Sequence, residues 1–164
     1  MKHAFILAAW PLAIAAALAC VEGCDNPGYY QGGPQASGSA IPPRSLWRAG
    51  GDLASPYKAI DGDTGTAAVS AETYANAALT IDLGKAAMFN MIIIDHGNSG
   101  AGFARRVAVL TSMDGKTFIH RHAGPGTRRF TLLCLATPTL ARYVRLQAVA
   151  QGHAPWTVAE VYVQ

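Results

Sequence analysis

The sequence predicts an all-β fold, a sandwich or a barrel, over residues 46–164. Two observations carry this prediction. From about residue 46, apolar segments of five to eight residues alternate with clusters of Gly, Pro, Asn and Asp. None of these segments keeps a helical period beyond about two turns. Short strands separated by turn signals every 8–12 residues or so are typical of sandwiches and barrels, and the chain is long enough for one such core.

Seven segments are expected to form strands, and one of them shows a clear alternation. Tyr143 and Arg145 are expected on one face of that strand. Arg142, Val144 and Leu146 are expected on the opposite face. The seven segments are residues 78–83, 89–95, 106–112, 117–123, 129–136, 141–149 and 157–163.

The N-terminus has the layout of a secretory signal peptide in residues 1–19. Lys2 precedes an apolar run at residues 4–19 that ends in small residues. The run is short for a membrane-spanning helix and contains a proline; a buried core helix is the alternative interpretation. We therefore expect an exported protein, periplasmic or at the cell surface.

The stretch Ala17-Leu18-Ala19-Cys20 resembles a bacterial lipobox, in which the cysteine becomes a lipidated N-terminus. Lipid on Cys20 would hold the protein on a membrane, whereas simple cleavage would release it. We expect the membrane anchor, with cleavage alone as the alternative. A second lipobox candidate ends at Cys24 and is weaker, because a glutamate interrupts its apolar run.

Residues 20–45 are rich in Gly, Pro, Ser and Gln, which is typical of a flexible linker. Two isolated thiols are the expected state of Cys24 and Cys134, and a disulfide between them in an oxidising periplasm is the alternative. Without residues 1–19 the chain carries 12 Lys and Arg against 10 Asp and Glu, a net charge of about +2. This bias is too small to indicate nucleic-acid binding.

Residues 58–66, KAIDGDTGT, hold more oxygen-bearing side chains than a turn requires. Asp61-Gly62 alone would read as a tight turn. Asp63 and Thr66 add hard oxygen donors of the kind that calcium prefers. An EF-hand is excluded, because Thr66 stands where that loop requires glycine and no helices flank the segment.

Five short motifs follow one another along the chain, at Ala59–Thr66, Asp82–Gly84, Ser112–Gly115, Ala141–Arg145 and Ala159–Val161. Together they resemble the discoidin family, also called the coagulation factor 5/8 type C domain, whose relatives include many bacterial carbohydrate-binding modules. The resemblance covers nearly all of residues 47–164. It implies a jelly-roll β-sandwich of the galactose-binding-domain-like type.

The resemblance also implies a structural calcium ion at the 58–66 turn. Two residues depart from the family pattern, since Ala68 and Ala78 stand where the family has large aromatic residues. The core is therefore expected to repack, or the loops to sit differently. The implied ligands are the carbonyls of Lys58, Asp63 and Ala159, the carboxylates of Asp61 and Glu160, and the carbonyl and hydroxyl of Thr66.

Ligands of the resembled family bind at one end of the sandwich, which corresponds here to loops 47–57, 70–77 and 96–104. Their large and polar residues suit sugar recognition, because a site that hydrogen-bonds hydroxyl groups rejects ligands lacking them. The expected contacts are Arg48, Tyr74, His96 and Asn98.

We expect a binding module rather than an enzyme, because the sequence holds no nucleophile elbow, Gly-rich phosphate loop or HExxH motif. The expected ligand is a carbohydrate. The alternative is a structural or interaction subunit that docks onto a partner protein in an envelope complex. His120 and His122 share a strand face and could bind a transition metal, but an exposed polar face is the favoured interpretation.

Overall fold

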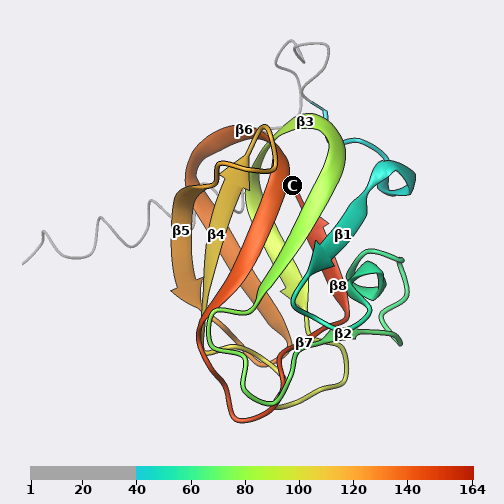
Figure 1. The fold of residues 1–164 in the computed structure, drawn as a ribbon, viewed down its shortest axis with the longest axis vertical. Helices are drawn as coiled ribbons and strands as arrows, with labels where there is room; N and C mark the ends of the chain where they lie inside the picture. Colours follow the sequence, from blue (N-terminus) through green and yellow to red (C-terminus); the bar gives the residue numbers. More distant parts are fainter. Residues whose placement is uncertain (1–39) are drawn as a thin grey trace, which may run out of the picture. The chain divides into compact units, whose positions relative to one another are not determined.

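The computed structural model describes residues 40–164, which form an antiparallel β-sandwich (Figure 1) and confirm the expected all-β fold. The expected signal peptide, the lipobox at Cys20 and most of the linker lie outside the described residues. The elements are η2 (Arg44–Leu46), β1 (Arg48–Gly51), η3 (Pro56–Ala59), β2 (Ala68–Val69), β3 (Ala78–Asp95), β4 (Arg106–Ser112), β5 (Ile119–Pro125), β6 (Phe130–Ala150), β7 (Thr157–Val158) and β8 (Glu160–Val163).

Two long bent strands, β3 and β6, join the layers of the sandwich (Figure 1). The first part of β3, residues 78–82, pairs with the last part of β6, residues 143–147. The last part of β3, residues 91–95, pairs with the first part of β6, residues 130–134. Each of these strands covers two of the expected segments. The expected strand at 157–163 is instead split into β7 and β8 at Ala159. β1 and β2 were not expected from the sequence.

Buried and more exposed side chains alternate along β3, as expected for a half-buried strand, and the alternation changes phase once. Leu79, Ile81 and Leu83 point into the core, and so do Ile92 and Ile94. The change from odd to even positions falls where the pairing with β6 shifts, between residues 89 and 91. A bulge of this kind moves side chains from one face to the other and lets a strand bend between layers.

Large aromatic residues complete the core at positions other than the two family positions that alanine occupies. Ala68 is buried, and Trp156 lies beside its strand, because the amide of Trp156 donates to the Ser70 hydroxyl at 2.8 Å. Trp47 and Trp156 are both almost fully buried. Two tryptophans outside the expected strands therefore supply large aromatic side chains to the core.

The alternation predicted for the strand at 141–149 holds in part. Val144 and Leu146 are fully buried as expected. Arg142 does not share their face: its guanidinium binds the Asp82 carboxylate through two hydrogen bonds of 2.8 Å. The pairing of β3 with β6 shifts between residues 82 and 87, and this irregularity turns the arginine away from the core.

The domain begins a few residues before the expected boundary at residue 46. Ile41 packs against the core, and the Pro42 carbonyl accepts a hydrogen bond of 3.0 Å from the Trp47 indole. Within residues 40–164, no helix has the length and apolar character needed to cross a membrane.

Cys134 differs from expectation, because it is disulfide-bonded rather than an isolated thiol. The prediction of two isolated thiols is therefore wrong for Cys134.

Candidate functional site

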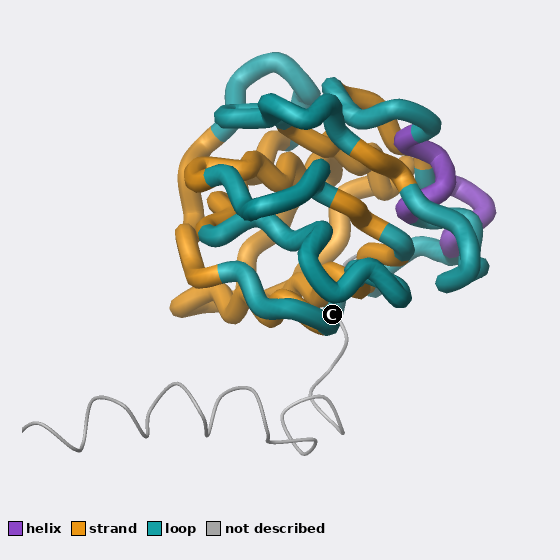
Figure 2. The backbone as a smooth tube through the Cα atoms, turned by 90° about the horizontal axis from the view of Figure 1, so that it is seen from below, coloured by secondary structure: helices purple, strands orange, loops and turns teal. Residues whose placement is uncertain are grey.

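One end of the sandwich is built from loops drawn from distant parts of the chain. We call it the loop end and define it by residues 52–55, 70–77, 96–105, 126–129 and 150–156. Figure 2, which looks onto this end, shows the loops lying side by side. Backbone hydrogen bonds fix the arrangement: Asn76 N–H to Ala148 O, Arg105 N–H to Ala150 O, Gly126 N–H to Arg105 O and Thr157 N–H to Gly102 O, all between 2.8 and 3.0 Å.

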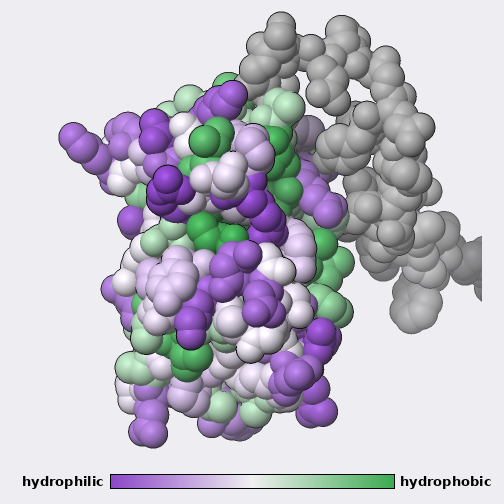
Figure 3. All heavy atoms as spheres, turned by 90° about the vertical axis from the view of Figure 1, so that its right-hand side faces the viewer, coloured by the Kyte–Doolittle hydropathy of each residue, from purple (hydrophilic) through white to green (hydrophobic). Residues whose placement is uncertain are grey.

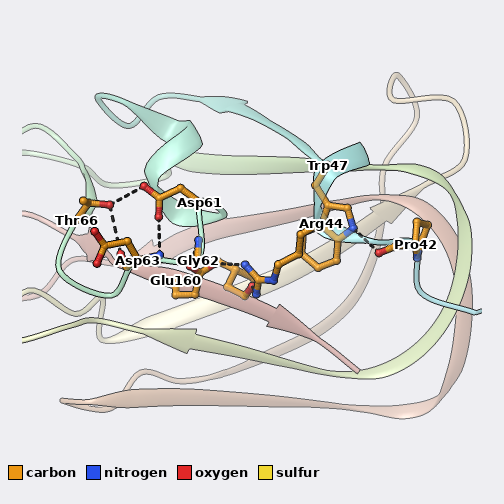
Figure 4. A network of polar contacts seen from close by, with 9 residues as sticks. Pro42, Arg44, Trp47, Asp61, Gly62, Asp63, Thr66 and Glu160 are labelled. Carbon is orange, nitrogen blue, oxygen red and sulfur yellow. Dashed lines mark hydrogen bonds and ion pairs between the residues drawn. The ribbon is translucent and has the colours of Figure 1, made fainter.

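The turn at 58–66 folds its oxygen atoms against one another (Figure 4). The two carboxylate oxygens of Asp61 accept hydrogen bonds from the Asp63 amide at 2.9 Å and from the Thr66 hydroxyl at 2.8 Å. The Asp63 carbonyl also accepts from the Thr66 amide at 3.1 Å. The bond from the Asp63 amide, followed by the bond from Thr66, lowers the pKa of Asp61. This carboxylate is therefore held ionised, as a metal ligand must be.

Glu160, the other implied carboxylate ligand, is almost fully buried at the start of β8. One of its oxygens accepts the Gly62 N–H at 2.8 Å, which joins it to the 58–66 turn. The other oxygen is bound by the Arg44 guanidinium (Figure 4). Arg44 also donates to the Val161 carbonyl at 2.6 Å and lies between the rings of Trp47 and Tyr162.

Gly97 brings the loop after β3 onto the same turn. It adopts a left-handed φ of 62°, and a side chain there would press against Ala159 and approach the Thr64 carbonyl. The amide of Ala159 donates to the Asp95 carbonyl at 2.8 Å. The 58–66 turn, the Asp95–Gly97 segment and the β7–β8 junction therefore meet in one place.

These donors fit calcium in kind, since they combine two carboxylates with a hydroxyl and carbonyl groups close to one another. Arg44 changes the charge balance, because it already supplies one positive charge to the buried Glu160. The carboxylate of Asp61 has no arginine or lysine within salt-bridge distance among residues 40–164. A cation at the turn would therefore rely mainly on Asp61 for charge, and would share Glu160 with Arg44.

The four expected ligand contacts do not form one cluster. Arg48 is exposed and is the first residue of β1, where it pairs with Asp82. Residues 52–55 follow the last residue of β1, so Arg48 lies at the end of the strand away from them. Its guanidinium donates to the carbonyls of Ser45 at 3.2 Å and Trp47 at 2.7 Å. Arg48 therefore supports the chain before β1 and is not part of the loop end.

Tyr74 and His96 belong to the loop end but face its interior. Tyr74 is 2% exposed, and its hydroxyl accepts a hydrogen bond from the Gly152 amide. His96 is fully buried, with Nδ1 2.7 Å from the Thr157 carbonyl and Nε2 2.9 Å from the Thr131 hydroxyl. Burial lowers the pKa of His96. Both residues brace loops to one another and are not available to a ligand.

Asn98 is the one expected contact that is exposed at the loop end. Its side-chain oxygen accepts a hydrogen bond of 3.2 Å from Arg129. Sequence reasoning missed the residues around it, Phe103, Arg105, Arg129 and His153. Arg-Arg pairs at 105–106 and 128–129 were visible in the sequence, but nothing local indicated that they come from loops that meet.

Phe103 is half-buried between two glycines of neighbouring loops. A side chain at Gly126 would collide with the Ala104 carbonyl and touch the Phe103 ring, and one at Gly152 would collide with the Phe103 carbonyl. The ring lies 6.3 Å from that of His96, and the Arg105 guanidinium lies 5.5 Å from its centre. The loop end thus presents an aromatic ring among hydrogen-bond donors.

The β5 face and the face beside β1 offer less to a ligand than the loop end does. His120 is exposed and His122 half-buried on β5, and among residues 40–164 no three His, Cys, Asp or Glu side chains form a group that could hold a metal. Burial, followed by the charges of His120 and Arg106, lowers the pKa of His122. The face beside β1 and the 58–66 turn carries only small, separate hydrophobic groups among polar residues (Figure 3).

The chain folds into a jelly-roll β-sandwich, one end of which is built from loops (Figure 1). The family model described as F5/8 type C domain matches residues 35–161. The chain belongs to this family, which confirms the resemblance read from its motifs. No curated protein matches the sequence.

Solved structures of low identity share the fold. The family 32 carbohydrate-binding module of Clostridium perfringens NanJ, solved with galactose, is 22% identical with a TM-score of 0.64, covering 76% of this chain and 97% of that one. The Clostridium perfringens module CpGH89CBM32-5, solved with GalNAc-β-1,3-galactose, is 21% identical with a TM-score of 0.66, covering 76% and 99%. The family 32 module of AlyQ, solved with 4,5-unsaturated mannuronic acid, is 20% identical with a TM-score of 0.56, covering 71% and 93%.

Proposed function

We propose that this protein is a non-catalytic carbohydrate-binding module whose ligand lies on the loop end. The observation that carries the proposal is the half-buried ring of Phe103, set among the exposed donors Asn98, Arg105 and His153. An aromatic ring with polar groups placed beside it suits a sugar ring, which has C–H faces and hydroxyl edges. The family 32 modules that share the fold were solved with sugars bound, which supports a carbohydrate ligand.

A titration calorimetry experiment tests this function. The purified protein is titrated with galactose, N-acetylgalactosamine and oligosaccharides of neutral and acidic sugars. We expect saturable binding to at least one glycan and at least about a tenfold loss with Phe103→Ala, which corresponds to about 1.4 kcal/mol. Phe118→Ala, outside the loop end, is the matched control and should bind normally. Absence of binding to every glycan, or equal affinity of Phe103→Ala and the native protein, would contradict the proposal.

We propose further that calcium stabilises the 58–66 turn and takes no part in chemistry. The ion would be held by the carbonyls of Lys58, Asp63 and Ala159, the carboxylates of Asp61 and Glu160, and the carbonyl and hydroxyl of Thr66. The contacts among Asp61, Asp63 and Thr66, and the Gly62 bond to Glu160, support this proposal. When bound, the ion would tie an early turn to the last strand.

The chain is proposed to be exported and held on a membrane through lipid on Cys20, in the periplasm or at the cell surface. The apolar run at 4–19 and the small residues before Cys20 support this. A glycan-binding domain on such an anchor would hold a polysaccharide close to the membrane.

A further inference from the structure

The loop end concentrates positive charge. Among residues 40–164, Lys and Arg number 12 and Asp and Glu number 8, which gives 12 − 8 = +4. The basic residues at or directly beside the loop end are Arg105, Arg106, Arg128, Arg129 and His153, all exposed. Within the described residues, Arg129 is the only one of these arginines with a carboxylate in salt-bridge distance, at 3.5 Å from Asp95. The other three arginines are not neutralised by a neighbouring acid.

Two side chains of this surface, Arg105 and His153, are joined by a hydrogen bond. A guanidinium N–H of Arg105 donates to Nε2 of His153, which lies 48 positions further along the chain, and the guanidinium also lies over Phe103. A guanidinium has no acceptor, so the ring nitrogen accepts in this bond and His153 positions Arg105. An anion lying against Arg105 would accept charge-assisted hydrogen bonds from its remaining N–H groups.

Arg129 forms a second donor site on the neighbouring loop. One of its guanidinium nitrogens donates to the Gly97 carbonyl at 3.0 Å and to the Asn98 side chain at 3.2 Å. The guanidinium also lies 5.2 Å from the ring centre of Phe130, which is 44% exposed. Protein contacts thus hold this arginine in place, and its remaining N–H groups can reach a ligand without a large loss of side-chain entropy.

The acidic residues of the loop end belong to other loops or are already engaged. A carboxylate oxygen of Asp52 accepts the Ala78 amide at 2.9 Å, and Asp95 is buried and accepts the Gly97 amide at 2.7 Å. Glu72 is exposed on the 70–77 loop, where its carbonyl accepts a hydrogen bond of 2.9 Å from the Gln151 side chain. The 96–105, 126–129 and 150–156 loops therefore form a basic side of the loop end, with Phe103 within it.

We propose that this basic side binds an anionic glycan, a polysaccharide whose sugars carry carboxylate or sulfate groups. The proposal rests on the proposed carbohydrate-binding function and names the ligand class of that same site. Arg105, positioned by His153, would bind the oxyanion of one sugar, Phe103 would contact its ring face, and Arg129 would meet the next charged group. Both acidic chemistries present oxygen acceptors that suit guanidinium groups.

The test compares charged and neutral versions of one glycan. The purified protein is titrated with oligogalacturonate, with its methyl ester, with a sulfated galactan and with the same galactan after desulfation. We expect an acidic glycan to bind at least about tenfold more tightly than its neutral counterpart, with affinity falling as salt rises. The carboxylate and sulfate arms distinguish the two sources of charge.

Two matched double variants test whether the acidic glycan binds at the basic side of the loop end. Arg105→Gln with Arg128→Gln removes two charges from the basic side, and Lys85→Gln with Lys116→Gln removes two charges elsewhere on the exposed surface. The first should weaken acidic-glycan binding by about tenfold or more, and the second by less than about twofold. Equal losses in the two variants, or neutral glycans that bind as tightly as acidic ones, would overturn the proposal and leave the broader function standing. Absence of binding to all four glycans would also overturn the proposal, and it would contradict the broader function only if galactose, N-acetylgalactosamine and the other oligosaccharides fail to bind as well.

Discussion

Arg44 and Glu160 lie 116 positions apart in the sequence and form an ion pair at the edge of the sandwich, with the carboxylate 1% and the guanidinium 32% exposed at their side chains. The pair joins the chain before β1 to the last strand. It also places a positive charge on the carboxylate that the family resemblance assigns to calcium. Residues 41–46 are therefore part of the domain and influence the 58–66 turn.

Removing Arg44 should destabilise the protein and make it depend more on calcium. Arg44→Gln leaves the buried Glu160 carboxylate without its cation, and breaking a buried pair in this way costs about 3–5 kcal/mol. We expect about 2–4 kcal/mol, because Arg44 is partly exposed and solvent screens the interaction. Urea unfolding in chelator and in calcium measures both effects, and the gain from calcium should be larger in the variant than in the native protein.

The double variant Arg44→Gln with Glu160→Gln is the control for this prediction. It leaves no unpaired buried charge at the position of this pair, so it should recover part of the lost stability. If Arg44→Gln unfolds at the same urea concentration as the native protein, the pair is not the structural link described above.

Calcium should raise the melting temperature of the native protein, because a ligand that binds only the folded state stabilises it by mass action. Asp61→Ala should abolish this increase, since it removes the one implied carboxylate ligand that has no cationic partner among residues 40–164. Asp114→Ala, on the β4–β5 turn, is the comparison and should keep the full increase. A native protein whose melting temperature is the same in calcium and in chelator would rule out the calcium site.

His96 should contribute to stability above about pH 6.5, and this contribution should decline in acid. Burial lowers the pKa of His96 below the ordinary histidine value of 6.5, so at lower pH the unfolded chain takes up a proton that the folded state resists. The neutral ring keeps its bonds to Thr157 and Thr131. The stability difference between native protein and His96→Ala, about 2–4 kcal/mol at pH 7.5, should therefore shrink as the pH falls toward 5.

Denaturant melts across that pH range measure the effect, with His120→Ala as the comparison at an exposed histidine. His120→Ala should change stability little at any pH. A difference for His96→Ala that stays constant from pH 7.5 to pH 5 would show that this histidine does not carry the pH dependence.

Much of this fold follows from its sequence, because strands with one buried face leave an alternating pattern. The family resemblance carried by the motifs at Ala59–Thr66 and Ala159–Val161 also implied that these two distant segments would meet, as they do. The join of two expected strands into one bent β3 was not predictable, since it depends on bulges opposite β6 rather than on local composition. The binding surface was even harder to predict from the sequence. Polar residues such as His96 look the same in a sequence whether they brace loops or face solvent.

The three cysteines should be in two different chemical states, one lipidated and two joined in a disulfide. Mass spectrometry of the protein from its native membrane should find Cys20 as a lipidated N-terminus. A non-reducing digest should find Cys134 linked to Cys24, because lipidation consumes the other thiol. Cys134→Ser should lose that linked peptide. An unmodified Cys20, or a Cys134 that alkylates without prior reduction, would contradict the respective part of this prediction.

The most direct test of the central claim is a map of the binding surface by NMR. Backbone amide signals are followed while the protein is titrated with the glycan that binds best in calorimetry. We predict that the perturbed amides fall in residues 96–105, 126–129 and 150–156, with Phe103 and Arg105 among the largest changes. Perturbations confined to the hollow formed by Thr111, Asp114, Ile119 and Leu140, with the loop end unchanged, would contradict the account.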